Sequence, residues 1–151
     1  MGLEEADYLN ERASVVEILR SLVDSPADLA ATLQAVLGNA VRLANTDSGF
    51  IYLKDGDVYR HASDVGATVE VVAFNKANPI RPGRGTSTGR AAFERRVVHI
   101  PDVELDEEYE HRDAQRLGGF RSLLSVPMFH RDEVIGVLSV FRTDLRPFTE
   151  D

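Results

Sequence analysis

Residues 120–141 of the chain read FRSLLSVPMFHRDEVIGVLSVF, which is two apolar runs on either side of a short polar turn. Two strand-like segments joined by a charged turn predict a β-hairpin. Alternation along the second run would place Val134, Gly136, Leu138 and Val140 on one face, and Ile135, Val137, Ser139 and Phe141 on the other. Because both sets are mostly apolar, we expect other layers to cover both faces of the sheet.

Two helices are predicted before the first strands. Apolar residues spaced three and four apart indicate a helix over residues 4–24 and another over residues 26–44, and Ser25-Pro26 supplies the start of the second. The apolar stripe of the first helix is wide and also fits heptad-like spacing, so core packing and a dimer seam both remain open. A hairpin over residues 48–63 follows, with its turn at Asp55-Gly56.

The middle of the chain carries mixed signals. Valines favour a strand over residues 68–77, but the residue spacing there also suits a short helix before Pro79, and we favour the helix. The three hydroxyl residues 86–88 can cap a further helix that runs to residue 95. After it we expect a short strand over residues 97–100, an acidic loop over residues 101–110 and one or two helical turns over residues 111–117.

The composition fits one domain, since 151 residues with 43% hydrophobic content are enough to bury a core. The formal net charge of −8 argues against nucleic-acid binding, which needs a basic face, and against attraction to an anionic membrane. The absence of cysteine excludes disulfides, cysteine-ligated zinc and thiol chemistry. The sequence has neither a run of about 20 apolar residues nor a signal peptide, so we expect a cytoplasmic protein without a membrane partner.

Four segments, in this order and at this spacing, resemble the GAF domain: PGRGTSTGRAAFERRVVHIPDV at residues 82–103, GFRSLLSVPM at 119–128, EVIGVLSV at 133–140 and RPFTED at 146–151. The resemblance covers residues 26–151 and leaves residues 1–25 as an N-terminal signalling and dimerisation helix. It implies an α+β fold of the GAF, PAS and profilin type, in which helices sandwich a central six-stranded antiparallel sheet. The last segment resembles the start of the terminal helix of such domains, so we expect this sequence to be truncated before that helix.

The resemblance also implies a function. GAF domains occur in bacterial histidine kinases, nucleotide cyclases and other regulators, where they pass the state of a small ligand through helices to an output domain. We therefore expect a non-catalytic sensing domain that binds a small molecule, forms a homodimer through its N-terminal helix and regulates an output domain outside this sequence. The alternative is a structural dimerisation and relay module that binds no ligand.

The residues expected to bind the ligand are Arg84, Thr86, Ser87, Arg90, Phe93, His99, Asp102, Tyr109, His111 and Phe120. At the start of the helix over residues 86–95, free backbone N–H groups, hydroxyls and nearby arginines would suit a phosphate or a carboxylate. The same pattern also describes an ordinary capped helix with solvated arginines, so both interpretations remain open. A cavity lined by the predicted residues would favour the sensor, whereas a pocket plugged by Phe93 or Tyr109 would favour the ligand-free module.

Opposite charges gather in two neighbouring segments. Residues 81–96 contain five arginines and one glutamate, and residues 102–113 contain seven acidic residues. Ion pairs between these segments could close a lid over the pocket, but exposed pairs contribute little, and we favour two solvated faces. The acidic segment lacks the glycine-punctuated pattern of a calcium loop, so no metal site is expected.

His111 tests the resemblance to cofactor-binding GAF domains. Bilin-binding members carry a Cys-His pair at a set distance before a Val-Pro step, and here His111 precedes Val126-Pro127 at about that distance, with Glu110 in place of the cysteine. A covalent bilin is therefore excluded, and Leu117 at the position of the proximal histidine of haem-binding members argues against haem. Free methionine sulfoxide reductases of this fold need cysteines, so neither a cofactor nor that activity is expected.

Overall fold

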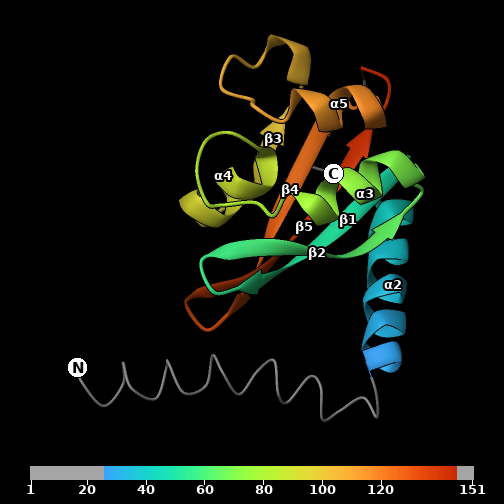
Figure 1. Cartoon of the computed structure of the whole chain (residues 1–151), viewed down its shortest axis with the longest axis vertical. Coiled ribbons are helices and arrows are strands. Elements are labelled where there is room, and N and C mark those ends of the chain that lie inside the picture. The colour runs from blue at the N-terminus through green and yellow to red at the C-terminus, as the bar shows by residue number, and fades with distance from the viewer. Residues whose placement is uncertain (1–25, 146–151) are drawn as a thin grey trace, which may run out of the picture.

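The computed structural model describes residues 26–145, and these residues form an antiparallel β-sheet with helices on both faces (Figure 1). The strands are β1 (Ser48–Asp55), β2 (Val58–Val65), β3 (Val98–Ile100), β4 (Ser122–His130) and β5 (Glu133–Arg142). Their order across the sheet is β2-β1-β5-β4-β3. Both predicted hairpins are therefore formed, and β1 pairs with β5 from the far end of the chain. The predicted helix over residues 4–24, with its dimer seam, and the segment RPFTED lie outside the described residues.

The helices divide between the two faces of the sheet (Figure 1). The long helix α2 (Pro26–Leu43) packs on one face, and the short helices α3 (Val69–Ala77), α4 (Ser87–Glu94) and α5 (Arg112–Gly118) lie over the other. Alternation along β1 explains how one strand serves both layers. Ile51 is buried with Leu37 and Val41 of α2, whereas its neighbours Phe50 and Tyr52 belong to the core beneath the short helices.

The sixth strand implied by the GAF resemblance is absent from residues 26–145, where the sheet has five strands. The nearest approach to a sixth strand is Ile80, which exchanges two backbone hydrogen bonds with Tyr59 of β2, at 2.7 and 2.9 Å. Pro79 and Pro82 lie on either side of Ile80. Because proline has no N–H to donate, the pairing stops at one isolated bridge.

The predicted face of Val134 is wrong, and a β-bulge is the reason. Met128 pairs with Gly136 while the next residue, Phe129, pairs with Val134, so Ile135 is an extra residue in β5. The extra residue turns Val134 to the face of the sheet that carries the core beneath the short helices. Gly136 is required at this point, because a Cβ there would lie 2.7 Å from the carbonyl oxygen of Tyr52.

Local sequence explains the elements between the two hairpins. The favoured helix is confirmed as α3, which Thr68 caps by accepting the N–H of Val71 at Oγ1 over 3.3 Å. The acidic loop contains a 3₁₀ turn that was not predicted, η1 (Val103–Leu105). Asp102 caps this turn by accepting the N–H of Glu104 at Oδ1 over 3.1 Å. Gly119 ends α5 in the left-handed conformation, with φ of +69°.

Leu37→Ala should lower the free energy of unfolding by about 2–5 kcal/mol, the usual cost of truncating a buried leucine. Leu37 is fully buried between α2 and the sheet, whereas the adjacent Val36 is 48% exposed. Urea unfolding followed by circular dichroism measures the change. Val36→Ala is the matched control and should change stability by less than about 0.5 kcal/mol. Equal losses in the two variants would contradict the docking of α2 on the sheet.

Candidate functional site

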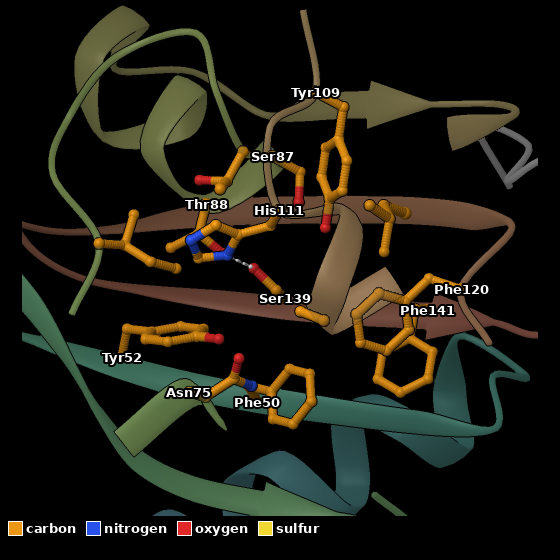
Figure 2. Close-up of a pocket in the computed structure, with 14 residues that line it drawn as sticks. Phe50, Tyr52, Asn75, Ser87, Thr88, Tyr109, His111, Phe120, Ser139 and Phe141 are labelled. Atoms are coloured by element: carbon orange, nitrogen blue, oxygen red, sulfur yellow. Dashed lines mark hydrogen bonds between the residues drawn. The ribbon is translucent and has the colours of Figure 1, made fainter. Parts of the chain in front are cut away.

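A small cavity lies between the sheet and the three short helices, and Figure 2 shows the side chains around it. Its volume is about 30 Å³. Since a cavity needs roughly 10–15 Å³ to hold one water, there is room for two or three waters or for a ligand of similar size. The residues that line it are Phe50, Tyr52, Asn75, Ile80, Thr86, Ser87, Thr88, Tyr109, His111, Ala114, Phe120, Leu123, Ser139 and Phe141.

Aromatic rings form one wall of the cavity. Phe120 and Phe141 have ring centroids 4.1 Å apart, and Phe50 stacks on Phe141 at 5.4 Å. These rings come from three different strands or strand ends, so the sheet itself fixes their positions. The wall is apolar, and the polar groups of the cavity must therefore supply any specific recognition.

Buried hydroxyls form a hydrogen-bonded chain across the opposite side. Ser125 donates to Ser87 at 2.9 Å, Ser125 and Ser139 lie 2.6 Å apart, and Ser139 and Thr88 lie 2.7 Å apart. The dashed line in Figure 2 is the bond between Thr88 and Ser139. Ser125 and Ser139 face each other on β4 and β5, so the chain joins the sheet to the first turn of α4.

Three further polar side chains point into the cavity without a hydrogen-bond partner among residues 26–145 (Figure 2). Asn75 of α3 is 2% exposed, and its Nδ2 is unsatisfied. The phenol groups of Tyr52 and Tyr109 are 3% and 7% exposed. Burial raises the pKa of both tyrosines well above the ordinary value, so both remain protonated and keep an O–H to donate.

The N-terminus of α4 adds backbone donors to the same cavity. Thr86 caps the helix by accepting the N–H of Gly89 at Oγ1 over 2.8 Å, and its carbonyl accepts the N–H of Arg90 at 2.9 Å. The first N–H groups of a helix have no acceptor within the helix, and the helix dipole places partial positive charge there. Ser87 and Thr88, which carry these groups, both line the cavity.

His111 lies at the edge of the cavity and is half-buried. Its ring meets Phe74 edge-on, with centroids 5.6 Å apart. Burial lowers the pKa of His111 below its ordinary value, although the nearby acids Glu110 and Asp113 oppose that shift. The imidazole is therefore mainly neutral at neutral pH, and its contribution is a polar, uncharged group.

Arg90 is not the solvated residue that the sequence suggested. It is 5% exposed, and its guanidinium forms a bidentate ion pair with Asp106, with N···O distances of 2.7 and 2.5 Å. Its Nε also donates to the carbonyl of Arg84 at 2.6 Å. Arg112 holds the same loop from the other side by donating to the carbonyls of Val103 and Asp106. Ion pairs between the basic and acidic segments, the less favoured of the two alternatives, are therefore present.

Arg84 lies outside the cavity in a second, more open hollow of about 370 Å³. Its guanidinium donates to both carboxylate oxygens of Glu108, at 2.9 and 3.0 Å, and also to Glu94. Glu110 borders the same hollow and lies against Gly85. Both arginines that were expected to attract an anion are thus paired with carboxylates.

The ten predicted site residues divide into two groups. Thr86, Ser87, Tyr109, His111 and Phe120 line the cavity together. Phe93, which is 62% exposed, and His99, on the exposed side of β3, lie away from it, and Asp102 pairs with Arg121 at 3.1 Å. Phe93 therefore does not plug the pocket, and Tyr109 is part of its wall.

Sequence reasoning missed several residues of the site, chiefly Phe50, Tyr52, Asn75 and the serines at 125 and 139. The serines carried a usable signal. Each interrupts an apolar run in a strand predicted to be buried on both faces, and a buried hydroxyl requires a polar neighbour. Asn75 carried none, because asparagine near the end of a short helix is common at a surface.

Among residues 26–145, no group of histidine, aspartate and glutamate side chains could hold a metal ion. No helix in that range combines the length and the apolar character needed to cross a membrane.

Comparison with known proteins identifies the fold. Residues 26–151 match the family model described as the GAF domain. Similar structures include a Staphylococcus aureus NreA protein mutated in its nitrate binding site (20% identity, 80% of this chain and 91% of that chain, TM-score 0.65). Another is the GAF domain of an Acinetobacter phosphoenolpyruvate-protein phosphotransferase (22% identity, 94% of this chain and 80% of that chain, TM-score 0.65). A third is a type II free methionine-R-sulfoxide reductase from Thermoplasma acidophilum (18% identity, 80% of this chain and 78% of that chain, TM-score 0.62). A search of curated protein sequences found no match. At these identities the structural likeness shows the fold.

Arg90→Ala should lower the free energy of unfolding by about 3–5 kcal/mol, because it leaves Asp106 with an uncompensated charge in a largely buried position. Chemical denaturation measures the loss. Arg84→Ala removes an arginine of the same segment whose ion pairs are exposed, and it should leave the midpoint nearly unchanged. A midpoint that moves equally in both variants would show that burial of the Arg90 pair contributes nothing.

Acid should weaken the wild type more than the Arg90→Ala variant. The Arg90 guanidinium holds the pKa of Asp106 below its ordinary value. A carboxyl whose pKa is depressed by folding contributes stability above its unfolded-state pKa, and that contribution is lost as pH falls through the folded-state pKa. Urea midpoints measured between about pH 7 and pH 3 should therefore fall more steeply for the wild type. Parallel pH profiles would contradict the assignment to this pair.

Proposed function

The chain belongs to the GAF domain family, and on that premise we propose that it is a non-catalytic, small-molecule-sensing domain of a bacterial signal-transduction protein, such as a histidine kinase or a nucleotide cyclase. The ligand would occupy the cavity between the sheet and helices α3, α4 and α5. Its binding state would reach an output domain through the helices on the opposite face.

The observation that carries this proposal is the set of unsatisfied donors around the cavity. Native proteins pair nearly all buried polar groups, because an unpaired one costs about 1–3 kcal/mol. Here the Asn75 amide and the phenols of Tyr52 and Tyr109 converge from three different elements on one cavity without partners among the described residues. A bound ligand that accepts hydrogen bonds would satisfy all three.

The chemistry of the cavity favours binding over catalysis. Its tyrosines stay protonated and its histidine is mainly neutral, as described above. The serines of the cavity bond to one another and not to a histidine, so none of them has an activating base. The chain has no cysteine for thiol-based redox chemistry.

A path from the cavity to α2 supports the relay part of the proposal. Phe50 and Tyr52 line the cavity, and Ile51 between them packs against α2, so a shift of β1 acts on both. A second connection runs through β2. The His61 ring contacts Tyr52 and its Nε2 lies 2.8 Å from Asp64, and Gln34 of α2 donates to the Asp64 carbonyl at 3.0 Å.

The ligand-free relay module remains the second candidate, and the small volume of the cavity favours it. Two or three ordered waters could satisfy the same donors. In that case the cavity would be a hydrated part of the core, and the module would act through its helices alone.

Ala114→Leu tests the sensor against the ligand-free module. Ala114 is buried in the cavity wall, and three added carbon atoms should fill the cavity and abolish ligand binding. We expect native mass spectrometry and a thermal-shift screen of small polar metabolites to detect a ligand for the wild type, since a ligand that binds only the folded state raises the melting temperature.

Ala73→Leu, on the exposed side of α3, is the matched control and should respond as the wild type does. If a ligand stabilises Ala114→Leu as strongly as it stabilises the wild type, that ligand binds outside the cavity. If no compound stabilises the wild type, and Ala114→Leu is the more stable protein, the ligand-free module is the better description.

A further inference from the structure

We infer that the ligand of this cavity is a compact monoanion held entirely by uncharged hydrogen-bond donors. The inference rests on the proposed sensory function of the same site and adds the chemical class of the ligand. The groups around the cavity donate from several directions, and no positively charged side chain of the described residues lines it.

The first set of donors consists of side chains. Asn75 is more than nine-tenths buried and lines the cavity, and its Nδ2 is unsatisfied. Figure 2 shows the amide oxygen turned toward the middle of the cavity and Nδ2 beside Phe50, and a rotation of the amide group by about 180° would present the N–H donors to a ligand. Tyr52 and Tyr109 add two phenol O–H groups. Each phenol retains its proton because burial raises its pKa, and Figure 2 shows both phenol oxygens directed into the cavity. Two O–H groups and an amide N–H can converge on the oxygens of one small anion.

Proton counting along the hydroxyl chain identifies another donor. Each hydroxyl has one proton to donate. Ser125 donates its proton to Ser87, so Ser139 must be the donor in its bond with Ser125. Because Ser139 has then used its proton, Thr88 must be the donor to Ser139. The proton of Ser87 is the one left over, and Ser87 lines the cavity. The hydroxyl chain therefore leaves the O–H of Ser87 able to donate to a ligand in the cavity.

The α4 N-terminus lies beside these donors. Its free N–H groups and its partial positive charge favour an anion over a neutral molecule. A helix start alone does not define a ligand site, but here the unsatisfied Asn75 amide reaches the same cavity from a different helix. The α4 N-terminus and the Asn75 amide are independent features, and each has N–H groups that lack a hydrogen-bond acceptor.

The charge of the anion follows from how the arginines are used. Asp106 neutralises Arg90, and Glu108 and Glu94 neutralise Arg84. Glu110 at the rim adds a negative charge near the outer hollow. Burying an ion costs more as its charge rises, so a site without a cation disfavours a dianion such as sulfate relative to a monoanion. A weakly hydrated monoanion can be held by neutral donors and a helix dipole alone.

Size sets the remaining limit. The cavity of about 30 Å³ accepts an ion of a few atoms and no nucleotide, sugar or cyclic cofactor. Aromatic edges and faces from Phe50, Phe120 and Phe141 bound it on one side. A flat ion with oxygens at its corners, such as nitrate or formate, matches both the walls and the donors.

Isothermal titration calorimetry at constant ionic strength tests the inference, with sodium nitrate, sodium formate, sodium sulfate and sodium phosphate as the probes. We expect nitrate or formate to bind at least a hundredfold more tightly than sulfate and phosphate. Asn75→Leu and Tyr52→Phe should each weaken monoanion binding roughly ten- to a hundredfold, the usual effect of losing a charge-assisted hydrogen bond.

Tyr59→Phe is the matched control. It removes a buried phenol that donates to the Val134 carbonyl at 2.8 Å outside the cavity, so it should leave binding unchanged even if it lowers stability. Sulfate binding as tight as nitrate binding would overturn the inference, and so would full nitrate affinity in both Asn75→Leu and Tyr52→Phe.

The failure of this inference can be told apart from the failure of the sensory function. If urea or another neutral compound found in the metabolite screen binds the wild type but not Ala114→Leu, and none of the four anions does, the site is a sensor pocket for neutral ligands. If neither neutral compounds nor anions bind, both proposals fail and the cavity holds water.

Discussion

The buried ion pair between Arg90 and Asp106 is the interaction on which the cavity depends. It ties the second turn of α4 to the acidic loop, and the same loop carries Tyr109 and His111 to the cavity. Arg90 also holds the carbonyl of Arg84 and so fixes the segment before the helix. Without this pair, the loop and the segment before α4 would still be joined by the exposed Arg84–Glu108 ion pair and by the Glu110 N–H bonded to the Gly85 carbonyl at 2.7 Å, but they would lose their buried anchor.

The strands and most helices could be predicted from the sequence because their signals are local. Alternation and turn residues identify both hairpins, and Thr68 and Thr86 identify two helix starts. The face of Val134 could not be predicted, because the bulge at Ile135 depends on how β4 and β5 pair. The prediction of a sixth strand rested on the resemblance to GAF domains, and the prolines around Ile80 were the local evidence against that strand.

The site was harder to predict than the fold. Half of the predicted residues line the cavity, and they lie either at the start of α4 or in the segment between β3 and β4. Arg84 and Arg90 were assigned to an anion because sequence shows a charge without showing its partner. Asp106 lies 16 residues from Arg90 along the chain, and Glu108 lies 24 residues from Arg84, so only folding brings each pair together. Asn75 and Tyr52 come from elements that sequence reasoning treated as framework.

The single bridge between Tyr59 and Ile80 has a consequence for behaviour at high concentration. An open edge strand can recruit a strand from another molecule, which is a common route to aggregation. β2 is an edge strand of this sheet, and Ile80 already occupies the outward N–H and C=O of Tyr59. The flanking prolines prevent that short segment from becoming a new edge in its turn. The segment that leads into the cavity therefore also blocks strand addition at this position of the β2 edge.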